Sequence, residues 1–232
     1  MYEIILSENG STDSTLNLAK RLARKYHFVR VIHSDAPSYG QAFRRGIYDA
    51  ETNTIVQFDL DFWDVDFLTK ALKLLERYDI VLGSKNLSTS GDQRSLGRRM
   101  TSKVIEILIR LRFGSVMTDT HGLKVLKRSK LLMQLPYVSC PNHFFDSELL
   151  LRAEVAGSKV AELPVSLREI RASRFSFFLR SRDVAMELLQ LVASDVGSLH
   201  VIRWWPVLSR LTPVFSMVMS IGLVKKLLPR IK

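Results

Sequence analysis

The sequence contains only one cysteine, Cys140, among its 232 residues. A single thiol excludes an internal disulfide framework, and no cluster of Cys and His has the spacing of a zinc finger. This composition fits a reducing compartment, and we expect Cys140 to be a buried structural thiol. Hydrophobic residues make up 47% of the chain and charged residues 25%. These fractions indicate a globular protein with one sizeable core, or a domain with an appendage.

Acidic residues are scarce relative to basic ones. The chain has 23 Asp and Glu against 34 Lys and Arg, a net charge of +11. Such an excess is typical of proteins that bind nucleic acid, an anionic membrane surface or phosphorylated substrates. Residues 165–232 hold 11 basic and 4 acidic residues, so +7 of the +11 lies beside the most apolar segment. No RNA-binding aromatic signature is present, so we expect a membrane surface, and no nucleic acid, as partner.

The sequence also shows no secretory signal, because the apolar run after Met1 is too short, and we expect it to begin directly with a strand. Strand and helix patterns then alternate. Strands are predicted at 4–6, 29–32, 54–58, 80–83 and, at a sheet edge, 159–165; helices are predicted at 14–26, 40–50, 67–78, 98–112, 129–134 and 146–156. This order predicts an α/β fold whose mostly parallel sheet is flanked by helices. In such sheets ligands bind beyond the carboxyl ends of the strands, where Glu8 and Asp59 lie.

Two carboxylates, Asp59 and Asp61, follow the predicted strand 54–58. On an extended strand these side chains point to the same side, while Leu60 packs on the other. Carboxylate pairs with open coordination positions hold Mg²⁺ or Mn²⁺ against substrate phosphates. The alternative is that an acidic pair merely ends a strand.

Seven segments of the chain resemble, in order and spacing, the motifs of a single family. They are Glu8-Asn9-Gly10-Ser11-Thr12-Asp13, Asp59-Leu60-Asp61, Gly83-Ser84-Lys85, Arg98-Arg99 with Ser102, Asp119-Thr120-His121-Gly122-Leu123-Lys124, Phe145-Asp146-Ser147-Glu148-Leu149, and Arg168 with Ser173-Arg174-Phe175. Each segment alone is a weak signal. Together they resemble the inverting glycosyltransferases of family 2, in the polyprenyl-phosphate glycosyltransferase branch typified by dolichol-phosphate mannose synthase.

The resemblance implies a GT-A-like fold and a role for each motif. Glu8 would contact the nucleotide base, while Asp59 and Asp61 would hold Mg²⁺ or Mn²⁺ on the diphosphate, which makes Asp61 a catalytic residue. Asp146 and Arg168 would also act in catalysis, on the acceptor side and on phosphate. The further contacts implied for the nucleotide sugar and its phosphates are Lys85, Arg98, Arg99, Lys124, Ser173 and Arg174.

Several of these residues have a structural alternative. Carboxylates such as Asp146 and Glu148 are favoured near a helix N-terminus by the macrodipole. Arg98 and Arg99 suit a solvated helix face. The basic loop from Arg168 suits a segment beside an anionic membrane.

The chain departs from the family pattern at two places. The family has a strand, followed by a Pro-x-Tyr-Asn-Glu type loop, before the segment that corresponds to Glu8, and we expect this domain to lack that first strand. Trp63 stands where dolichol enzymes often carry a metal-contacting Gln, and an indole has no lone pair to offer a cation.

The C-terminal part predicts two membrane-associated helices, and the domains are therefore expected at 1–178 and 179–232. Asp183–Val196 is amphipathic, and Trp204–Val224 is an apolar run interrupted by Arg210. Tryptophans at one end and lysines at the other favour an interfacial anchor over a full span. The alternative is a buried pair of core helices.

The resemblance and the charge pattern imply a function. We expect inverting transfer of a hexose from a GDP- or UDP-sugar to a polyprenyl phosphate, dolichyl or undecaprenyl, by a membrane-associated enzyme whose catalytic domain faces the cytoplasm. Two alternatives stand beside it: a family 2 enzyme acting on a sugar hydroxyl, with Asp146 or Glu148 as base, and a truncated, inactive membrane-binding protein.

Overall fold

The computed structural model describes residues 2–60, 62–87, 96–142, 144–166, 186–192 and 196. The chain divides into two units after Val196, and all described residues belong to the first. The expected domain boundary at residue 178 and the apolar run Trp204–Val224 lie outside the described residues, while residues 186–192 are helical, as expected for the amphipathic segment. Within the described ranges, no helix is long and apolar enough to cross a membrane.

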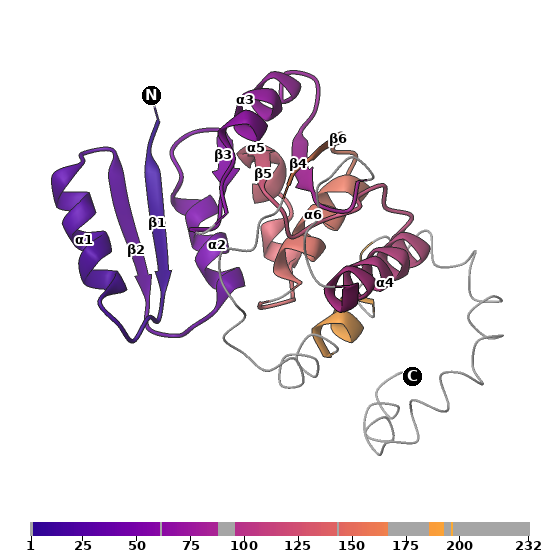
Figure 1. Cartoon of the computed structure of the whole chain (residues 1–232), viewed down its shortest axis with the longest axis horizontal. Helices are drawn as coiled ribbons and strands as arrows, with labels where there is room; N and C mark the ends of the chain where they lie inside the picture. The colour runs from indigo at the N-terminus through magenta and orange to yellow at the C-terminus, as the bar shows by residue number, and fades with distance from the viewer. Residues whose placement is uncertain are drawn as a thin grey trace, which may run out of the picture. The chain divides into compact units, whose positions relative to one another are not determined.

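Two parallel strands open the fold (Figure 1). β1 (Ile4–Asn9) leads through α1 (Thr15–Lys25) to β2 (Val29–Ser34), and α2 (Tyr39–Asp49) then leads to β3 (Thr54–Gln57). Short polar side chains set the helix starts. The Asp13 carboxylate accepts a hydrogen bond from the Thr15 N–H at 2.9 Å, and the Ser38 hydroxyl accepts one from the Gln41 N–H at 3.3 Å.

A four-stranded sheet with the order β3-β5-β4-β6 forms the rest of the described fold. The elements that follow β3 in the chain are α3 (Val65–Leu74), β4 (Ile80–Ser84), α4 (Leu96–Phe113), β5 (Lys124–Lys127), α5 (Arg128–Leu132), a 3₁₀ turn (Leu135–Tyr137), α6 (Phe145–Val155) and β6 (Val160–Pro164). β4 and β6 run parallel, whereas β5 is antiparallel to both of its neighbours.

The predicted elements are all present with shifted ends, and β6 lies at a sheet edge as predicted. β5 was not predicted, because its polar ends, Lys124 and Lys127, made the segment look like part of a loop. Its insertion between β3 and β4 makes this sheet mixed, so the expectation of a mostly parallel sheet holds only for the pairs β1-β2 and β4-β6.

The core fills both faces of the four-stranded sheet. Ile80 and Leu82 of β4 pack into a large cluster with α6, while Val81, between them, packs with Phe67 of α3 on the other face. This alternation is what a pleated strand imposes when both of its faces are covered. Cys140 is buried in the large cluster, as predicted, and burial raises the pKa of its thiol.

Candidate active site

The carboxyl end of β1 carries a structured acidic loop. Glu8 is buried and accepts a hydrogen bond from the Ser11 N–H at 2.5 Å, and its other oxygen lies 2.5 Å from Nδ1 of His33. The hydrogen bonds from Ser11, opposed by burial and assisted by His33, hold the pKa of Glu8 below its usual value. Gly10 turns the loop at φ +74°, and a Cβ there would lie 2.8 Å from the carbonyl oxygen of Asp35. The loop therefore fixes an ionised Glu8 at the end of β1.

Asp59 lies beyond the carboxyl end of β3, but not on an extended strand. β3 ends at Gln57, and residues 59 and 62 close a tight turn through a backbone hydrogen bond of 3.2 Å. Leu60, expected to pack against the protein, is 85% exposed, so the prediction of strand alternation across this motif was wrong. Asp61 lies outside the described residues. The Asp59 carboxylate is exposed and accepts a hydrogen bond from the Gln57 amide at 3.1 Å.

One cavity joins the two acidic segments. It has a volume of about 580 Å³, and both Glu8 and Asp59 are among its lining residues, as is Tyr39 at the start of α2. This is the position expected for a ligand in an α/β sheet, at the carboxyl ends of strands. Glu8 and Asp59, which the sequence predicted to lie at the carboxyl ends of strands, thus line the same cavity.

A buried polar chain connects Asp59 to the interior. The Gln57 side chain donates to Asp59 and accepts a hydrogen bond from Nζ of Lys124 at 3.1 Å. Lys124 is fully buried, and its Nζ lies 2.6 Å from Oδ2 of Asp146. The Tyr39 hydroxyl donates to the same oxygen at 2.9 Å. Four elements, β3, β5, α6 and α2, thus supply one connected network.

The contacts of the network use one oxygen of Asp146, Oδ2, and leave the other without a donor among the described residues. Burial and the negative charges of Asp146 and Asp59 raise the pKa of Tyr39, so Tyr39 is a neutral hydrogen-bond donor. The second oxygen of Asp146, Oδ1, is buried and accepts no hydrogen bond from the part of the chain that the structure describes. A buried carboxylate oxygen without a donor is costly. Asp146 therefore offers one acceptor position beyond those that the network uses.

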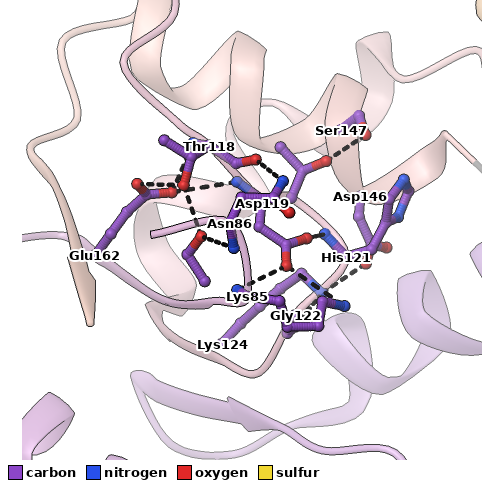
Figure 2. Close-up of polar contacts among 12 residues, drawn as sticks. Lys85, Asn86, Thr118, Asp119, His121, Gly122, Lys124, Asp146, Ser147 and Glu162 are labelled. Atoms are coloured by element: carbon purple, nitrogen blue, oxygen red, sulfur yellow. Dashed lines mark hydrogen bonds and ion pairs between the residues drawn. The ribbon is translucent and has the colours of Figure 1, made fainter. Parts of the chain in front are cut away.

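A second polar cluster lies beside this network (Figure 2). Asp119 accepts hydrogen bonds from the backbone N–H groups of Lys85 and His121, and Nζ of Lys85 lies 3.4 Å from its Oδ2. Burial acts to raise the pKa of Asp119, but the charge of Lys85 and these N–H groups outweigh it, and the pKa lies below its usual value. Two of the motif segments, 83–85 and 119–124, are thus in contact.

Edge strand β6 and helix α6 hold the Asp119 loop from two sides. Glu162 accepts hydrogen bonds from the N–H and hydroxyl of Thr118, at 2.7 and 2.8 Å. The Thr120 hydroxyl lies 2.6 Å from that of Ser147, next to Asp146. Figure 2 shows both contacts converging on the loop. The loop is therefore tied to the same helix start that carries Asp146.

The oxygens of Glu148, the second carboxylate of that helix, are taken up by structural contacts. It is fully buried, accepts hydrogen bonds from the Ser139 and Cys140 N–H groups at 2.9 and 2.7 Å, and pairs with Arg152 at 2.9 Å. Of the two residues considered as a base, Asp146 is the one with an acceptor position left.

Five further predicted site residues cannot be placed. Arg168, Ser173 and Arg174, and the side chains of Arg98 and Arg99, lie outside the described residues. Conversely, Gln57 and Tyr39 belong to the network but were assigned no role from sequence. Gln57 has a sequence signal, because a polar residue two positions before Asp59 on a strand lies on the same side as that carboxylate. Tyr39 has no sequence signal, since its partner is 107 residues away.

The residues present fit a divalent cation at Asp59, since an exposed carboxylate on the rim of a cavity is the kind of oxygen ligand that Mg²⁺ and Mn²⁺ take. Among the described residues no three His, Cys, Asp or Glu gather as a complete metal site. Trp63 is 66% exposed after the turn. The second expected ligand, Asp61, lies outside the described residues.

Comparison with curated proteins gives several glycosyltransferases. The chain is 32% identical over 169 residues to glycosyltransferase AglD of Haloferax volcanii, covering 71% of this chain and 27% of that protein. It is 24% identical over 216 residues to the dolichyl-phosphate beta-glucosyltransferase of Saccharomyces cerevisiae, covering 81% of this chain and 63% of that one. The chain thus spans less than two thirds of the length of these two relatives.

Comparison with solved structures identifies the fold. The glucosyl-3-phosphoglycerate synthase of Mycobacterium tuberculosis, solved with uridine diphosphate, matches with a TM-score of 0.59 over 82% of this chain and 69% of that one, at 19% identity. The same synthase has also been solved with Mn²⁺ and with Mg²⁺.

The model of the family described as "Glycosyl transferase family 2" matches residues 1–133, more than half of the chain. This protein belongs to glycosyl transferase family 2.

Proposed function

We propose that this protein transfers a hexose from a nucleoside diphosphate sugar to a polyprenyl phosphate. The observation that carries the proposal is the cavity lined by both Glu8 and Asp59 at the carboxyl ends of β1 and β3. Relatives named dolichyl-phosphate glucosyltransferase and dolichyl-phosphate hexose transferase support the acceptor class. The structural neighbour solved with uridine diphosphate supports the donor class.

The residues would share the work as follows. Glu8 lies where it can accept hydrogen bonds of a nucleotide base, and Asp59, together with Asp61 two residues later in the sequence, would hold Mg²⁺ or Mn²⁺. When bound, the cation supplies charge neutralisation for the departing diphosphate. A lipid phosphate oxygen attacks the anomeric carbon from the opposite side, and the nucleoside diphosphate leaves. Because the attacking phosphate is already anionic, positioning matters more than a strong base.

Asp146 fits a positioning role in this reaction. Its charge is balanced by Lys124 at 2.6 Å, and Tyr39 donates to it. Its Oδ1 offers an acceptor for a hydroxyl group of the sugar, and a phosphate would be repelled there. The proposed roles of Lys85, Arg98, Arg99, Arg168, Ser173 and Arg174 are contacts with phosphate. The basic side chains are suited to this by their charge, and the Ser173 hydroxyl can donate a hydrogen bond.

A second candidate function uses the same carboxylate as a base toward a sugar hydroxyl. The acceptor position left on Asp146 Oδ1 favours it. Offering a polyprenyl phosphate and a free sugar as competing acceptors separates the two functions. Transfer to the sugar alone, abolished by Asp146→Asn, would assign the second function and overturn the first.

Membrane association is part of the proposal. Residues 197–232 contain six Lys and Arg and no Asp or Glu beside the apolar run, a pattern suited to an anionic membrane surface. The single Cys140 suits a catalytic domain on the cytoplasmic side. Expression in cells and protease protection of sealed vesicles tests this orientation; a domain shielded in cytoplasm-side-out vesicles would contradict it.

Substitution of Asp59 tests the enzyme itself. With UDP- or GDP-hexose, Mn²⁺ and dolichyl or undecaprenyl phosphate, we expect Asp59→Asn to lower kcat/KM roughly 100-fold, since charge neutralisation of the leaving group contributes several kcal/mol. Asp49→Asn, an exposed change in α2, is the matched control and should leave the rate unchanged.

Isothermal titration with UDP and GDP in the presence of Mn²⁺ completes the Asp59 test. Absence of nucleotide binding, together with absence of transfer from either sugar nucleotide, would refute the proposed function. Weaker nucleotide binding by Asp59→Asn only when Mn²⁺ is present would assign the residue to the cation.

A further inference from the structure

Helix α4 has apolar side chains on two opposite faces, and only one of these faces belongs to the core. Ile109 and Phe113 are buried in the large cluster. On the other face, five apolar side chains are between 40% and 69% exposed: Met100, Val104, Ile107, Leu108 and Leu111. Their spacing of i, i+4, i+7, i+8 and i+11 places them in one continuous line along the helix. We name this line the α4 stripe.

The charges of α4 are almost all of one sign. The helix holds five Lys and Arg against one acidic residue, Glu106, which is buried and pairs with Lys103 at 2.8 Å. Arg110 is exposed and lies beside one edge of the α4 stripe, with Arg112 beside the other, since successive residues are about 100° apart around a helix. The exposed side of α4 therefore combines apolar and basic side chains, with no exposed carboxylate among its described residues.

A second helix of the same character contacts α4. Residues 186–192 are helical, and the carbonyl oxygen of Val192 accepts a hydrogen bond from Nε of Arg112 at 3.1 Å. Met186 and Leu189 in this helix are 43% and 52% exposed. It is part of the segment that the sequence predicted to be amphipathic and membrane-associated. Figure 1 shows α4 on the side of the described unit away from α1. Two adjoining helices thus expose apolar side chains on this side.

Charge decides which partner fits the α4 stripe. A second copy of the chain, packed stripe to stripe, would set basic residues against basic residues. Residues 197–232, with six Lys and Arg and no Asp or Glu, would do the same. An anionic bilayer instead offers negative headgroups directly above an apolar layer, which is what a helix with an apolar face and basic flanks binds. We propose that α4 lies flat on an anionic phospholipid bilayer, with the α4 stripe among the acyl chains and Arg110 at the headgroups.

This contact would be made by the catalytic domain itself, in addition to the one proposed for residues 197–232. It would also set the depth of the active site relative to the lipid. The first turn of α4 contains Arg98 and Arg99, which would then lie at the level of the headgroups, where the phosphate of a polyprenyl phosphate is found. This last consequence rests on the proposed function, whereas the membrane contact does not.

A fluorescent label on the α4 stripe tests the contact directly. Cys140 is the only cysteine of the chain and is buried, so Val104→Cys in the full chain can be labelled selectively with the polarity-sensitive fluorophore nitrobenzoxadiazole. On adding vesicles of phosphatidylglycerol and phosphatidylcholine in equal parts, we expect its emission to rise severalfold and to be quenched by doxyl-labelled lipid. The same label at Leu72→Cys, an exposed position of α3, is the control and should show neither effect.

A double substitution measures how much the α4 stripe contributes to binding. Ile107→Gln with Leu111→Gln keeps good helix formers at exposed positions, so circular dichroism should stay unchanged. It should weaken sedimentation of the full chain with the same vesicles roughly tenfold or more, since two apolar side chains no longer leave water. Leu72→Gln with Val155→Gln, at comparably exposed positions of α3 and α6, is the matched control and should bind normally. Neither experiment contains a sugar nucleotide, so failure here is separate from failure of the proposed transfer.

Several results would overturn the proposal. They are a label at position 104 that stays in water while the chain sediments with vesicles, undiminished binding by the double glutamine variant, and absence of vesicle binding altogether. Emission that is already high without vesicles would assign the α4 stripe to another segment of the chain, and emission that rises with protein concentration alone would assign it to a second copy. An equal response to vesicles of phosphatidylcholine alone would overturn the choice of an anionic surface.

Discussion

Lys124 shows how a residue predicted to contact phosphate can also hold the site together. Its Nζ contacts Asp146 at 2.6 Å, Gln57 at 3.1 Å and the Gly122 carbonyl at 2.9 Å, and its side chain is fully buried. Breaking an ion pair in this environment strongly destabilises the fold, because the remaining charge is buried where no water can solvate it. The structure thus gives Lys124 a role in positioning Asp146.

The substitution Lys124→Met should lower the free energy of unfolding by about 3–5 kcal/mol, because it leaves the Asp146 carboxylate buried and unpaired. Urea denaturation measures this. Lys127→Met, on the same strand, removes a partly exposed pair with Asp79 and should cost less than about 1 kcal/mol.

The double variant Lys124→Met with Asp146→Asn distinguishes a buried charge from lost packing. Because it removes both charges, it should recover a large part of the stability that Lys124→Met loses. Equal stability of the single and double variants would show that charge pairing does not govern this site.

Asp119 should make the stability of the protein depend on pH. Its folded-state pKa is depressed by Lys85 and two backbone N–H groups against the effect of burial. Its contribution is therefore fully present above the unfolded-state pKa of about 3.9 and is lost as the pH falls through the lower folded-state value. Asp119→Asn should lower the free energy of unfolding by more than about 1 kcal/mol at pH 7.

Acid titration of stability checks the Asp119 prediction. Below about pH 4 the wild-type protein should lose stability faster than Asp119→Asn, so the two curves should converge. Parallel curves would mean that Asp119 titrates alike in the folded and unfolded chain. Thermal unfolding at several pH values supplies the data.

At the scale of elements, α2 serves both sides of the site. Its first residue, Tyr39, donates to Asp146, and the Ser38 hydroxyl that caps it also donates to the Pro141 carbonyl at 3.1 Å. Gly40 lies so close to α6 that a Cβ would be 2.2 Å from the Pro141 oxygen and 2.8 Å from Phe145. The contact of α2 with the start of α6 therefore requires glycine.

Two alanine substitutions in this one helix should have opposite effects. Gly40→Ala should lower the melting temperature, by a destabilisation of about 2 kcal/mol or more, because backbone must move. Gly46→Ala meets no atom within 4 Å and should stabilise by about 0.5–1 kcal/mol through helix propensity. Calorimetry of both variants checks the pair; two changes of the same sign would contradict the packing argument.

At the scale of the whole molecule, the distribution of charge predicts that the basic C-terminal part of the chain binds anionic membranes. Lys225→Glu with Lys226→Glu reverses two charges beside the apolar run and should weaken sedimentation with anionic vesicles by roughly tenfold or more, at about 1 kcal/mol per basic residue lost. Lys20→Glu with Lys25→Glu, on α1, is the matched control.

Varying the salt concentration and the lipid composition separates electrostatic binding to vesicles from apolar insertion. Binding of the wild-type chain should fall with rising ionic strength and should be weak on neutral vesicles, since screening acts on exposed charges. Undiminished binding of the double reversal would assign membrane affinity to apolar insertion alone.

The sequence by itself determined the order of the strands and helices other than β5, the burial of Cys140 and the family, because these depend on local periodicity and on motifs read along the chain. It could not reveal that Leu60 is exposed, since a turn replaces the strand that its alternation assumed. Only the tertiary structure decided the antiparallel insertion of β5, the network from Asp59 to Asp146 and the cavity lined by residues of β1 and β3. Each of these depends on contacts between residues far apart in the chain, which no local pattern encodes.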